Sequence, residues 1–399
     1  MKETFDHGGT VFAVARQLGV SPDEILDFSA SINPLGPPVE ARGAVAAAFD
    51  RLVHYPDSGA TELRDALARR HHLLPENICV ANGSTELIYL VPRLVGGRRG
   101  LIVAPPFSEY AKGLSRAGWE IDYLDLSPAD CFTLHLEALD QRLAKGCDLL
   151  FLANPGNPTG ALIPREVIVE VVSLCRRHGT FLVLDEAFID FCEEESATDL
   201  VVAGEGAVVL RSMTKFYAIP GLRLGYAMGS EEVIARLSAL REPWSVNTLA
   251  QAAGLACLAD GEYPARTRAL VETEREWLSA GIARLPGLAV YPSAANYLLV
   301  RIDAGPTAPE LATRLLAERV LIRDCSSFRG LSERFFRVAV RGTEENRRLL
   351  ELLGRVFAVD ITRKHRATVF SVNKLVQKWS EFRVIPLLVV FHHGIEDGE

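Results

Sequence analysis

The sequence has few of the features that mark secreted or membrane proteins. Its seven cysteines are scattered along 399 residues, form no CxxC pair and have mostly apolar neighbours, so we expect buried, reduced thiols. No uninterrupted apolar run approaches the ~20 residues that cross a bilayer. The opening residues, MKETFDHGG, also lack the apolar stretch of a signal peptide. We therefore expect a cytoplasmic protein with no membrane contact, and we predict no metal site.

The chain also lacks an excess of positive charge. The formal net charge of -8 gives no broad attraction to nucleic acid or anionic lipid. The amino-terminal region shows no helix-turn-helix segment with basic patches. We expect no nucleic-acid partner, and individual basic residues are interpreted as site chemistry.

Lysine is rare, and one lysine stands in an informative context. Lys215 lies in the segment Arg211–Tyr226, RSMTKFYAIPGLRLGY, and no other lysine occurs between Lys145 and Lys364. A lysine with a lowered pKa is a Schiff-base nucleophile, and Ser212 and Arg223 would complete a pocket for a dianionic phosphate. The alternative is a solvated surface lysine.

The middle of the chain predicts an α/β domain. Short apolar runs alternate there with helix-like segments, which indicates a mostly parallel sheet covered on both faces. A chain of this length with 48% hydrophobic residues can bury two domains that share an interface. The predicted strands are Ile78–Ala81, Leu101–Ala104, Leu149–Ala153, Phe181–Leu184 and Ala207–Leu210.

The two flanking regions have different patterns. A short helix over Thr10–Leu18, stopped by Gly19, precedes an irregular stretch. Two helical segments follow Gly225, and a long helix over Tyr263–Leu285 then connects to a smaller α+β domain. The elements predicted for that domain are strands at Leu288–Tyr291, Tyr297–Ile302, Val320–Ile322 and Phe335–Val340, and helices at Pro309–Glu318 and Thr343–Phe357.

The predicted organisation has four parts. Residues 1–40 form an amino-terminal arm, residues 41–260 the large domain, and residues 261–359 the small domain with its bridging helix. Residues 360–399 form an atypical tail that holds three of the seven lysines. This tail is either an altered extension without a role or an added helix and strand, with Ile385–Phe391 packing at a partner surface.

Three segments together resemble the motifs of the class I/II aminotransferase superfamily of fold-type-I pyridoxal-phosphate (PLP) enzymes. They are NPGNPTG at Asn154–Gly160, DEAF at Asp185–Phe188 and the lysine segment. The resemblance implies a large domain with a mostly parallel seven-stranded sheet, a small α+β domain, and PLP held by Lys215 as a Schiff base. It also implies that Asn157 donates to the pyridine 3'-oxygen and that Asp185 pairs with the ring nitrogen. The family's usual tyrosine is replaced by Phe188.

The loop after the first predicted strand is suited to a phosphate. Asn82–Glu86 lies between that strand and a helix, where backbone N–H groups can hold an anion. By itself it is an ordinary tight turn. The resemblance implies that Gly83, Ser84 and Thr85 bind the PLP phosphate, together with Ser212 and Arg223.

Two aromatic residues match further family positions. Phe107 matches the aromatic that stacks on the cofactor ring, although a core phenylalanine is the alternative. Tyr55 matches a tyrosine that reaches the phosphate of the neighbouring subunit. The resemblance therefore implies a homodimer.

Arginines near the carboxyl end are candidate anion ligands. Arg337 and Arg341 are predicted on one face of a strand. Arg337 matches the family arginine that clamps the substrate α-carboxylate, whereas Arg341 is interpreted as a surface residue. Arg323 is a second candidate, for which a buried structural ion pair is the alternative.

The reaction depends on which bond at the substrate α-carbon stands perpendicular to the cofactor ring, and the lysine motif does not decide this. The amino-terminal HGG at His7 and the stretch Ile25–Pro37, ILDFSASINPLGP, resemble the signature of the threonine-phosphate decarboxylase family of cobalamin biosynthesis. Ser31 stands where asparagine is common. The resemblance implies a lyase that converts L-threonine O-3-phosphate into (R)-1-aminopropan-2-yl phosphate and carbon dioxide.

That substrate implies ligands at both of its ends. The resemblance assigns its phosphate to His7, Arg323 and Asn33, and its carboxylate end to Arg337 and Asn157. For His7 the alternative is a frayed terminal residue. Two other functions stay open: a histidinol-phosphate aminotransferase, and a catalytically silent PLP-binding regulator.

Overall fold

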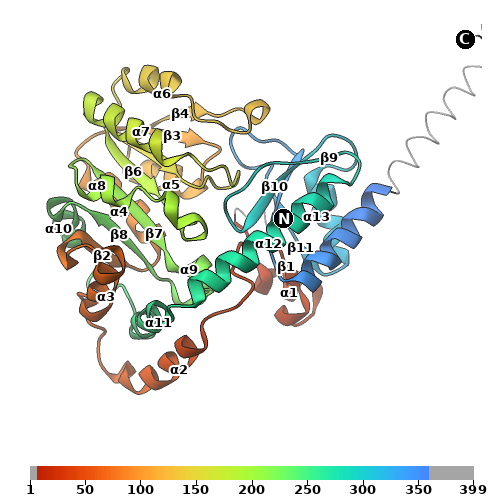
Figure 1. Ribbon diagram of the computed structural model, residues 1–399, viewed down its shortest axis with the longest axis horizontal. Coiled ribbons are helices and arrows are strands. Elements are labelled where there is room, and N and C mark those ends of the chain that lie inside the picture. Colours follow the sequence, from red (N-terminus) through yellow and green to blue (C-terminus); the bar gives the residue numbers. More distant parts are fainter. Residues whose placement is uncertain (1–6, 359–399) are drawn as a thin grey trace, which may run out of the picture.

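The computed structural model describes residues 7–358, and Figure 1 shows two bodies of unequal size joined by a long helix. The predicted tail at 360–399 lies outside the described residues. Within residues 7–358, no helix is both long and apolar enough to span a membrane.

The larger body is built on a seven-stranded sheet with the order β2-β8-β7-β6-β5-β3-β4. Every neighbouring pair from β7 to β4 runs parallel, while β8 is antiparallel to both of its neighbours. The predicted fold class is confirmed. The strands are β2 (Ile78–Ala81), β3 (Arg99–Ala104), β4 (Glu120–Asp125), β5 (Leu149–Ala153), β6 (Phe181–Asp185), β7 (Ala207–Ser212) and β8 (Gly225–Gly229).

Helices cover both faces of this sheet because its central strands are apolar on both sides. Leu182 and Leu184 of β6 belong to one buried cluster, and Val183 between them belongs to the other. The helices of the larger body are α2 (Val39–Ala48), α3 (Thr61–His71), α4 (Ser84–Leu94), α5 (Ser108–Arg116), α6 (Leu136–Leu143), α7 (Arg165–His178), α8 (Thr198–Val202), α9 (Met213–Phe216), α10 (Glu231–Ala239) and α11 (Thr248–Ala259).

The smaller body contains an antiparallel four-stranded sheet with the order β12-β13-β10-β9. Its core joins Leu278 of α12 (Tyr263–Ala283) to Phe336 and to Leu353 of the helix over residues 343–358. The other elements are β9 (Leu288–Val290), β10 (Tyr297–Ile302), α13 (Ala308–Ala317), β11 (Val320–Leu321), β12 (Arg323–Asp324) and β13 (Phe335–Ala339).

The amino-terminal segment packs on this smaller body. After α1 (Val11–Leu18), strand β1 (Leu26–Asp27) pairs in parallel with β11, and Phe28 lies in the small body's core. The chain from there to α2 crosses toward the larger body (Figure 1). The domain boundaries at residues 40, 260 and 359 stay a prediction.

The parallel strands carry the candidate site residues at their carboxyl ends. Asp185 closes β6, Lys215 lies just beyond β7, and Phe107 follows β3. In open α/β sheets, ligands bind outside these strand ends. The fold therefore gathers residues that are far apart in sequence along one edge of the sheet.

Candidate active site

A cavity of about 670 Å³ lies where the strand ends of the large body face the small body. Ten of the residues predicted from the sequence line it, and they come from both bodies and from the amino-terminal segment. They are His7, Ser84, Thr85, Phe107, Asn157, Asp185, Lys215, Arg223, Arg323 and Arg337.

Lys215 on the cavity wall has a lowered pKa. Burial and, to a smaller extent, the positive charge of Arg223 lower the pKa of Lys215 from 10.5 to about 8. Phe188 places its ring centroid 5.9 Å from Lys215 Nζ. A larger share of the amine is neutral near pH 8 than in an exposed lysine, as a nucleophile requires.

Asp185 is a buried carboxyl with defined hydrogen-bond partners. Its Oδ2 accepts a hydrogen bond of 2.6 Å from Tyr110 Oη, and its Oδ1 accepts one of 3.0 Å from the backbone N–H of Ala187. Burial raises the pKa of Asp185, against the opposing effect of these bonds and of Lys215. Tyr110 stacks on Phe151 at 4.8 Å, which fixes its hydroxyl. Sequence reasoning missed Tyr110, because nothing in its local pattern separates it from a core aromatic residue.

The start of α4 forms a cradle for an anion. The helix begins at Ser84, and no described side chain caps its first N–H groups. Gly83 has φ 78° and ψ 157°, and a Cβ on it would lie 2.5 Å from Arg223 Nη2. Gly225 also allows close approach, since its Cβ would lie 2.4 Å from Ser84 N. Open N–H groups beside a guanidinium suit a phosphate.

Arg337 reaches the cavity from the small body. It donates from Nη1 to Asn157 Oδ1 and from Nη2 to the carbonyl of Ser29 at 3.0 Å. Its guanidinium also lies 5.0 Å from the ring centroid of Tyr297. Arg337 Nε is buried and has no hydrogen-bond partner within residues 7–358. Arg337 therefore joins three parts of the chain at the cavity.

A second arginine lies beside it. Arg323 and Arg337 are direct partners in the antiparallel pairing of β12 and β13. Arg323 is buried, donates to Ser327 Oγ at 3.2 Å and lies 5.1 Å from the centroid of the Phe328 ring. The cavity thus has two guanidinium groups on neighbouring strands.

His7 lies at the edge of the cavity and contacts the protein. Its Nε2 is 2.9 Å from Glu109 Oε1, and its ring centroid is 5.8 Å from that of Phe107. Lys112 Nζ approaches the same carboxylate oxygen at 3.0 Å, and Tyr89 donates to Oε2 at 2.6 Å. Burial raises the pKa of Glu109, but the bonds from Tyr89 and Lys112 outweigh this and lower it overall.

Several predicted residues lie elsewhere. Asn33 is buried and donates from Nδ2 to the carbonyl of Phe216 at 2.7 Å, to Tyr263 Oη at 2.9 Å and to Thr267 Oγ1 at 2.8 Å. Its Oδ1 accepts from the Leu35 N–H at 3.0 Å. The predicted contact of Asn33 with the substrate therefore does not fit, because its amide already binds the protein.

Three other residues considered in the sequence analysis do not line the cavity either, and Arg341 among them was expected at the surface. Ser212 Oγ is buried 2.7 Å from Thr214 Oγ1. Tyr55 is 78% exposed and stacks on Trp244 at 4.5 Å. Arg341 lies beyond the end of β13, so its predicted place on that strand is wrong; its Nη2 pairs with Glu345 Oε1 at 2.6 Å.

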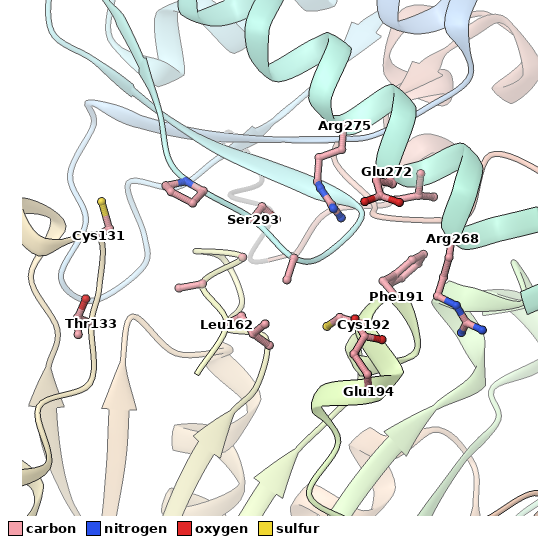
Figure 2. Close-up of a pocket in the computed structure, with 15 residues that line it drawn as sticks. Cys131, Thr133, Leu162, Phe191, Cys192, Glu194, Arg268, Glu272, Arg275 and Ser293 are labelled. Atoms are coloured by element: carbon pink, nitrogen blue, oxygen red, sulfur yellow. The ribbon is translucent and has the colours of Figure 1, made fainter. Parts of the chain in front are cut away.

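A second cavity, of about 570 Å³, lies against α12. Figure 2 shows Arg268 and Arg275 extending from this helix toward Phe191, Cys192 and Glu194. None of the predicted site residues lines it. Within residues 7–358, no group of three or more histidine, cysteine, aspartate or glutamate side chains is arranged to hold a metal ion.

The first cavity fits PLP on its own features. The phosphate would lie at the open start of α4 beside Arg223, and Phe107 and Ala187 line the space where a flat ring would lie. Asp185 provides a buried acid for a ring nitrogen, and Lys215 an amine of lowered pKa for the aldehyde. Arg323 and Arg337 of the small body line the same cavity, where they can contact the substrate.

Comparison with known proteins agrees with this arrangement. The chain matches the model of the family described as aminotransferase class I and II over residues 23–353. It belongs to this family and is a PLP-dependent enzyme.

Individual relatives show which members of this family the chain is similar to. The chain is 42% identical to a threonine-phosphate decarboxylase of Salmonella typhimurium over 352 residues, 88% of this chain and 96% of the relative. Among solved structures, L-threonine-O-3-phosphate decarboxylase from Porphyromonas gingivalis matches with a TM-score of 0.72 and 29% identity, covering 82% of this chain and 98% of the other. Histidinol-phosphate aminotransferase from Clostridium acetobutylicum matches with a TM-score of 0.79 and 28% identity, covering 84% and 99%.

Proposed function

We propose that this protein decarboxylates L-threonine O-3-phosphate to (R)-1-aminopropan-2-yl phosphate and carbon dioxide. The resemblance to threonine-phosphate decarboxylases over nearly their whole length supports the proposal. The observation that carries it within the site is the pairing of Arg323 with Arg337 across β12 and β13.

Two neighbouring guanidinium groups suit a short substrate with two anionic ends. Directly paired residues in an antiparallel sheet have Cα atoms about 4.5–5.5 Å apart. L-threonine O-3-phosphate bears its carboxylate and its phosphate ester on adjacent carbons, so both can reach this pair. Histidinol phosphate has one anionic group and an imidazole, so it offers this pair of arginines one anion instead of two.

We assign the carboxylate to Arg337 and the phosphate to Arg323, with His7 as a further phosphate ligand. Arg337 already contacts Asn157, which follows β5 near the proposed place of the ring. Arg323 lies on the neighbouring edge strand, β12, next to Ser327. His7 lines the same cavity, and its bond to Glu109 uses Nε2, which leaves Nδ1 for another partner.

The roles of the large-body residues follow from their contacts. When bound, PLP supplies a conjugated ring that accepts the electrons of the bond broken at the substrate α-carbon. Asp185 holds the proton on the ring nitrogen, supported by Tyr110. Arg337 holds the carboxylate so that its bond to the α-carbon is the one aligned for cleavage. Lys215 Nζ then returns a proton to the α-carbon after carbon dioxide leaves.

We also propose that the protein is a homodimer in which Tyr55 reaches the neighbouring site. The surface around Tyr55 supports this, since Phe49, Val53 and Trp244 are exposed apolar side chains there. Such patches on soluble proteins mark interaction surfaces. Sedimentation of the wild type and of Val53→Glu tests the dimer: a charge in the interface should yield monomers, and an unchanged dimer would contradict this assignment.

Amino transfer to 2-oxoglutarate is the second candidate function. The structure of histidinol-phosphate aminotransferase from Clostridium acetobutylicum matches this chain with a TM-score of 0.79. Incubating the PLP-loaded protein with L-threonine O-3-phosphate, with and without 2-oxoglutarate, separates the two. We expect carbon dioxide without any oxo acid, and none from Lys215→Ala. Glutamate formed from histidinol phosphate and 2-oxoglutarate, with no carbon dioxide from threonine phosphate, would instead establish the aminotransferase.

A further inference from the structure

A buried ionic cluster lies behind the cofactor cavity, on the opposite face of the sheet. Glu186 and Arg211 directly follow Asp185 and Leu210, the last residues paired between β6 and β7. Successive side chains of a strand point to opposite faces. Asp185 therefore faces the cavity, while Glu186 and Arg211 face away from it.

Arg211 is the centre of this cluster and is fully buried. It donates from Nη1 and Nη2 to the two carboxylate oxygens of Glu193, at 3.0 and 2.9 Å, and from Nη2 to Ser196 Oγ at 2.9 Å. Its Nε lies 3.0 Å from Glu186 Oε2, at an angle that makes this an ion pair and not a hydrogen bond. Asp190 Oδ1 is 3.7 Å from Nη1.

These partners belong to one continuous segment that begins in the cavity. Asp185, Ala187 and Phe188 line the cavity, and the 3₁₀ segment η5 (Ile189–Glu195) continues from them. Glu186 links the start of this segment to the residues just after η5, because its Oε1 accepts a hydrogen bond of 2.8 Å from the N–H of Ala197. Arg211 thus ties down both the start and the end of the segment.

The other side of the contact leads to Lys215. Arg211 lies in β7, four residues before Lys215, and helix α9 (Met213–Phe216) starts directly after that strand. A shift of Arg211 relative to Glu186 and Glu193 would change the distance between Asp185 and Lys215. No other described salt bridge joins these two segments.

The cluster also reaches the helix that leads to the small body. Arg70 of α3 lies 3.9 Å from Asp190, and Arg268 of α12 donates to the carbonyl of Asp190 at 3.1 Å. Figure 2 shows Arg268 beside Phe191 and Glu194 of η5. η5 therefore contacts both β7 and α12.

A contribution to folding stability does not by itself explain why this cluster of charged side chains is buried. Arginine is almost never fully buried unless it is paired, and replacing a buried ion pair by apolar residues is often neutral or stabilising. A bidentate arginine contact does fix geometry in two directions. The arrangement is therefore suited to holding two segments in register.

We infer that Arg211 is a positioning residue of the cofactor site, which holds the segment of Asp185 and the segment of Lys215 in register through Glu186 and Glu193. The inference rests on the proposed cofactor roles of Asp185 and Lys215. Arg211 does not line the cavity and acts only through these neighbours.

The test measures cofactor binding and not turnover. Apoprotein is titrated with PLP by absorbance, Lys215 is mapped after borohydride reduction, and the melting temperature is recorded. Small displacements of reacting groups cost up to about a hundredfold, so Arg211→Met should raise the Kd of PLP by about ten- to a hundredfold. Arg211→Lys keeps the charge without the fork and should give a smaller rise.

Two further variants separate positioning from stability. The triple variant Arg211→Met, Glu186→Gln, Glu193→Gln removes the two carboxylates closest to Arg211 and should regain part of the thermal stability, while the Kd stays raised. Val171→Ala, in the buried face of α7 and away from the cavity, should lower stability without changing the Kd.

Recovery of both stability and PLP affinity in the triple variant would overturn the inference, as would an equal loss of affinity in Val171→Ala. If Arg211→Met does not fold, Glu193→Gln provides the same comparison, since Glu193 is partly exposed and only one pair is lost. An unchanged Kd in that variant and in Arg211→Lys would also overturn the inference. None of these results depends on whether carbon dioxide is released, so failure of the proposed function stays distinguishable.

Discussion

Gly83→Ala tests the phosphate cradle, and its effect can be worked out from two separate terms. The first is backbone strain, since φ 78° and ψ 157° at Gly83 lie in a region that costs other residues about 1–3 kcal/mol. The second is steric. The new Cβ would lie 2.5 Å from Arg223 Nη2, so the guanidinium must retreat by about 0.9 Å to reach the 3.4 Å of ordinary contact.

The steric term is the one that should change cofactor binding. A displaced guanidinium loses a charge-assisted hydrogen bond to the phosphate, worth about 1.5–3 kcal/mol, so the Kd of PLP should rise by about ten- to a hundredfold. Gly118→Ala is the matched control, because Gly118 has φ 77° and a Cβ added to it would meet no atom within 4 Å. It should lower the melting temperature without weakening PLP binding.

The assay is titration of each apoprotein with PLP, followed by absorbance, beside a thermal melt. If Gly83→Ala binds PLP as tightly as the wild type does, Arg223 and the start of α4 do not hold the phosphate, and that part of the site is wrong. If both variants lose affinity equally, backbone strain and not the displaced guanidinium is responsible.

Three further predictions concern the other ends of the site. The pKa of Lys215 is lowered to about 8, so the rate at which the apoprotein forms the Schiff base with PLP should depend on pH. The rate should fall about tenfold per pH unit below pH 8, where the amine becomes protonated, and should level off above pH 8. A rate that still rises at pH 10 would contradict this. Tyr110→Phe removes a hydrogen bond from Asp185 and leaves its carboxylate less favoured, so kcat should fall several-fold, by about 1–2 kcal/mol, with KM little changed in steady-state assays. Arg323→Lys should raise KM for threonine phosphate alone, whereas Arg337→Lys should weaken inhibition by threonine as well, because both molecules share the carboxylate; equal effects of the two variants on both molecules would refute the assignment.

The strongly apolar parts of the fold were predictable from the sequence. Strands β2 and β5 have the predicted bounds, because a run of four or five apolar residues followed by turn-forming residues is typical of a buried strand. Strand β4 was missed because it lies at the edge and alternates with polar residues, and β8 because its GYAMG sequence has low strand propensity. Strands β4 and β8 form because they pair with neighbouring strands. The local sequence pattern carries no information about that pairing.

The candidate site divides in the same way. Motif residues such as Asp185, Lys215 and Arg337 line one cavity, as their place after strands predicts. Asn33 stands in a distinctive motif, but its amide is bound by residues more than 180 positions away, so its direction could not be read locally. Arg211 was visible in the lysine segment, yet its role depends on Glu186 and Glu193, which only the folded chain brings to it.

The most direct test of the proposed reaction follows the carboxylate carbon itself. The PLP-loaded protein is incubated in deuterium oxide with L-threonine O-3-phosphate that is isotope-labelled in that carbon, and the products are read by NMR. We predict labelled carbon dioxide and unlabelled 1-aminopropan-2-yl phosphate with one deuteron on the carbon that lost the carboxylate. Label that stays in the organic product, as a 2-oxo acid or as deuterated threonine phosphate, would contradict decarboxylation.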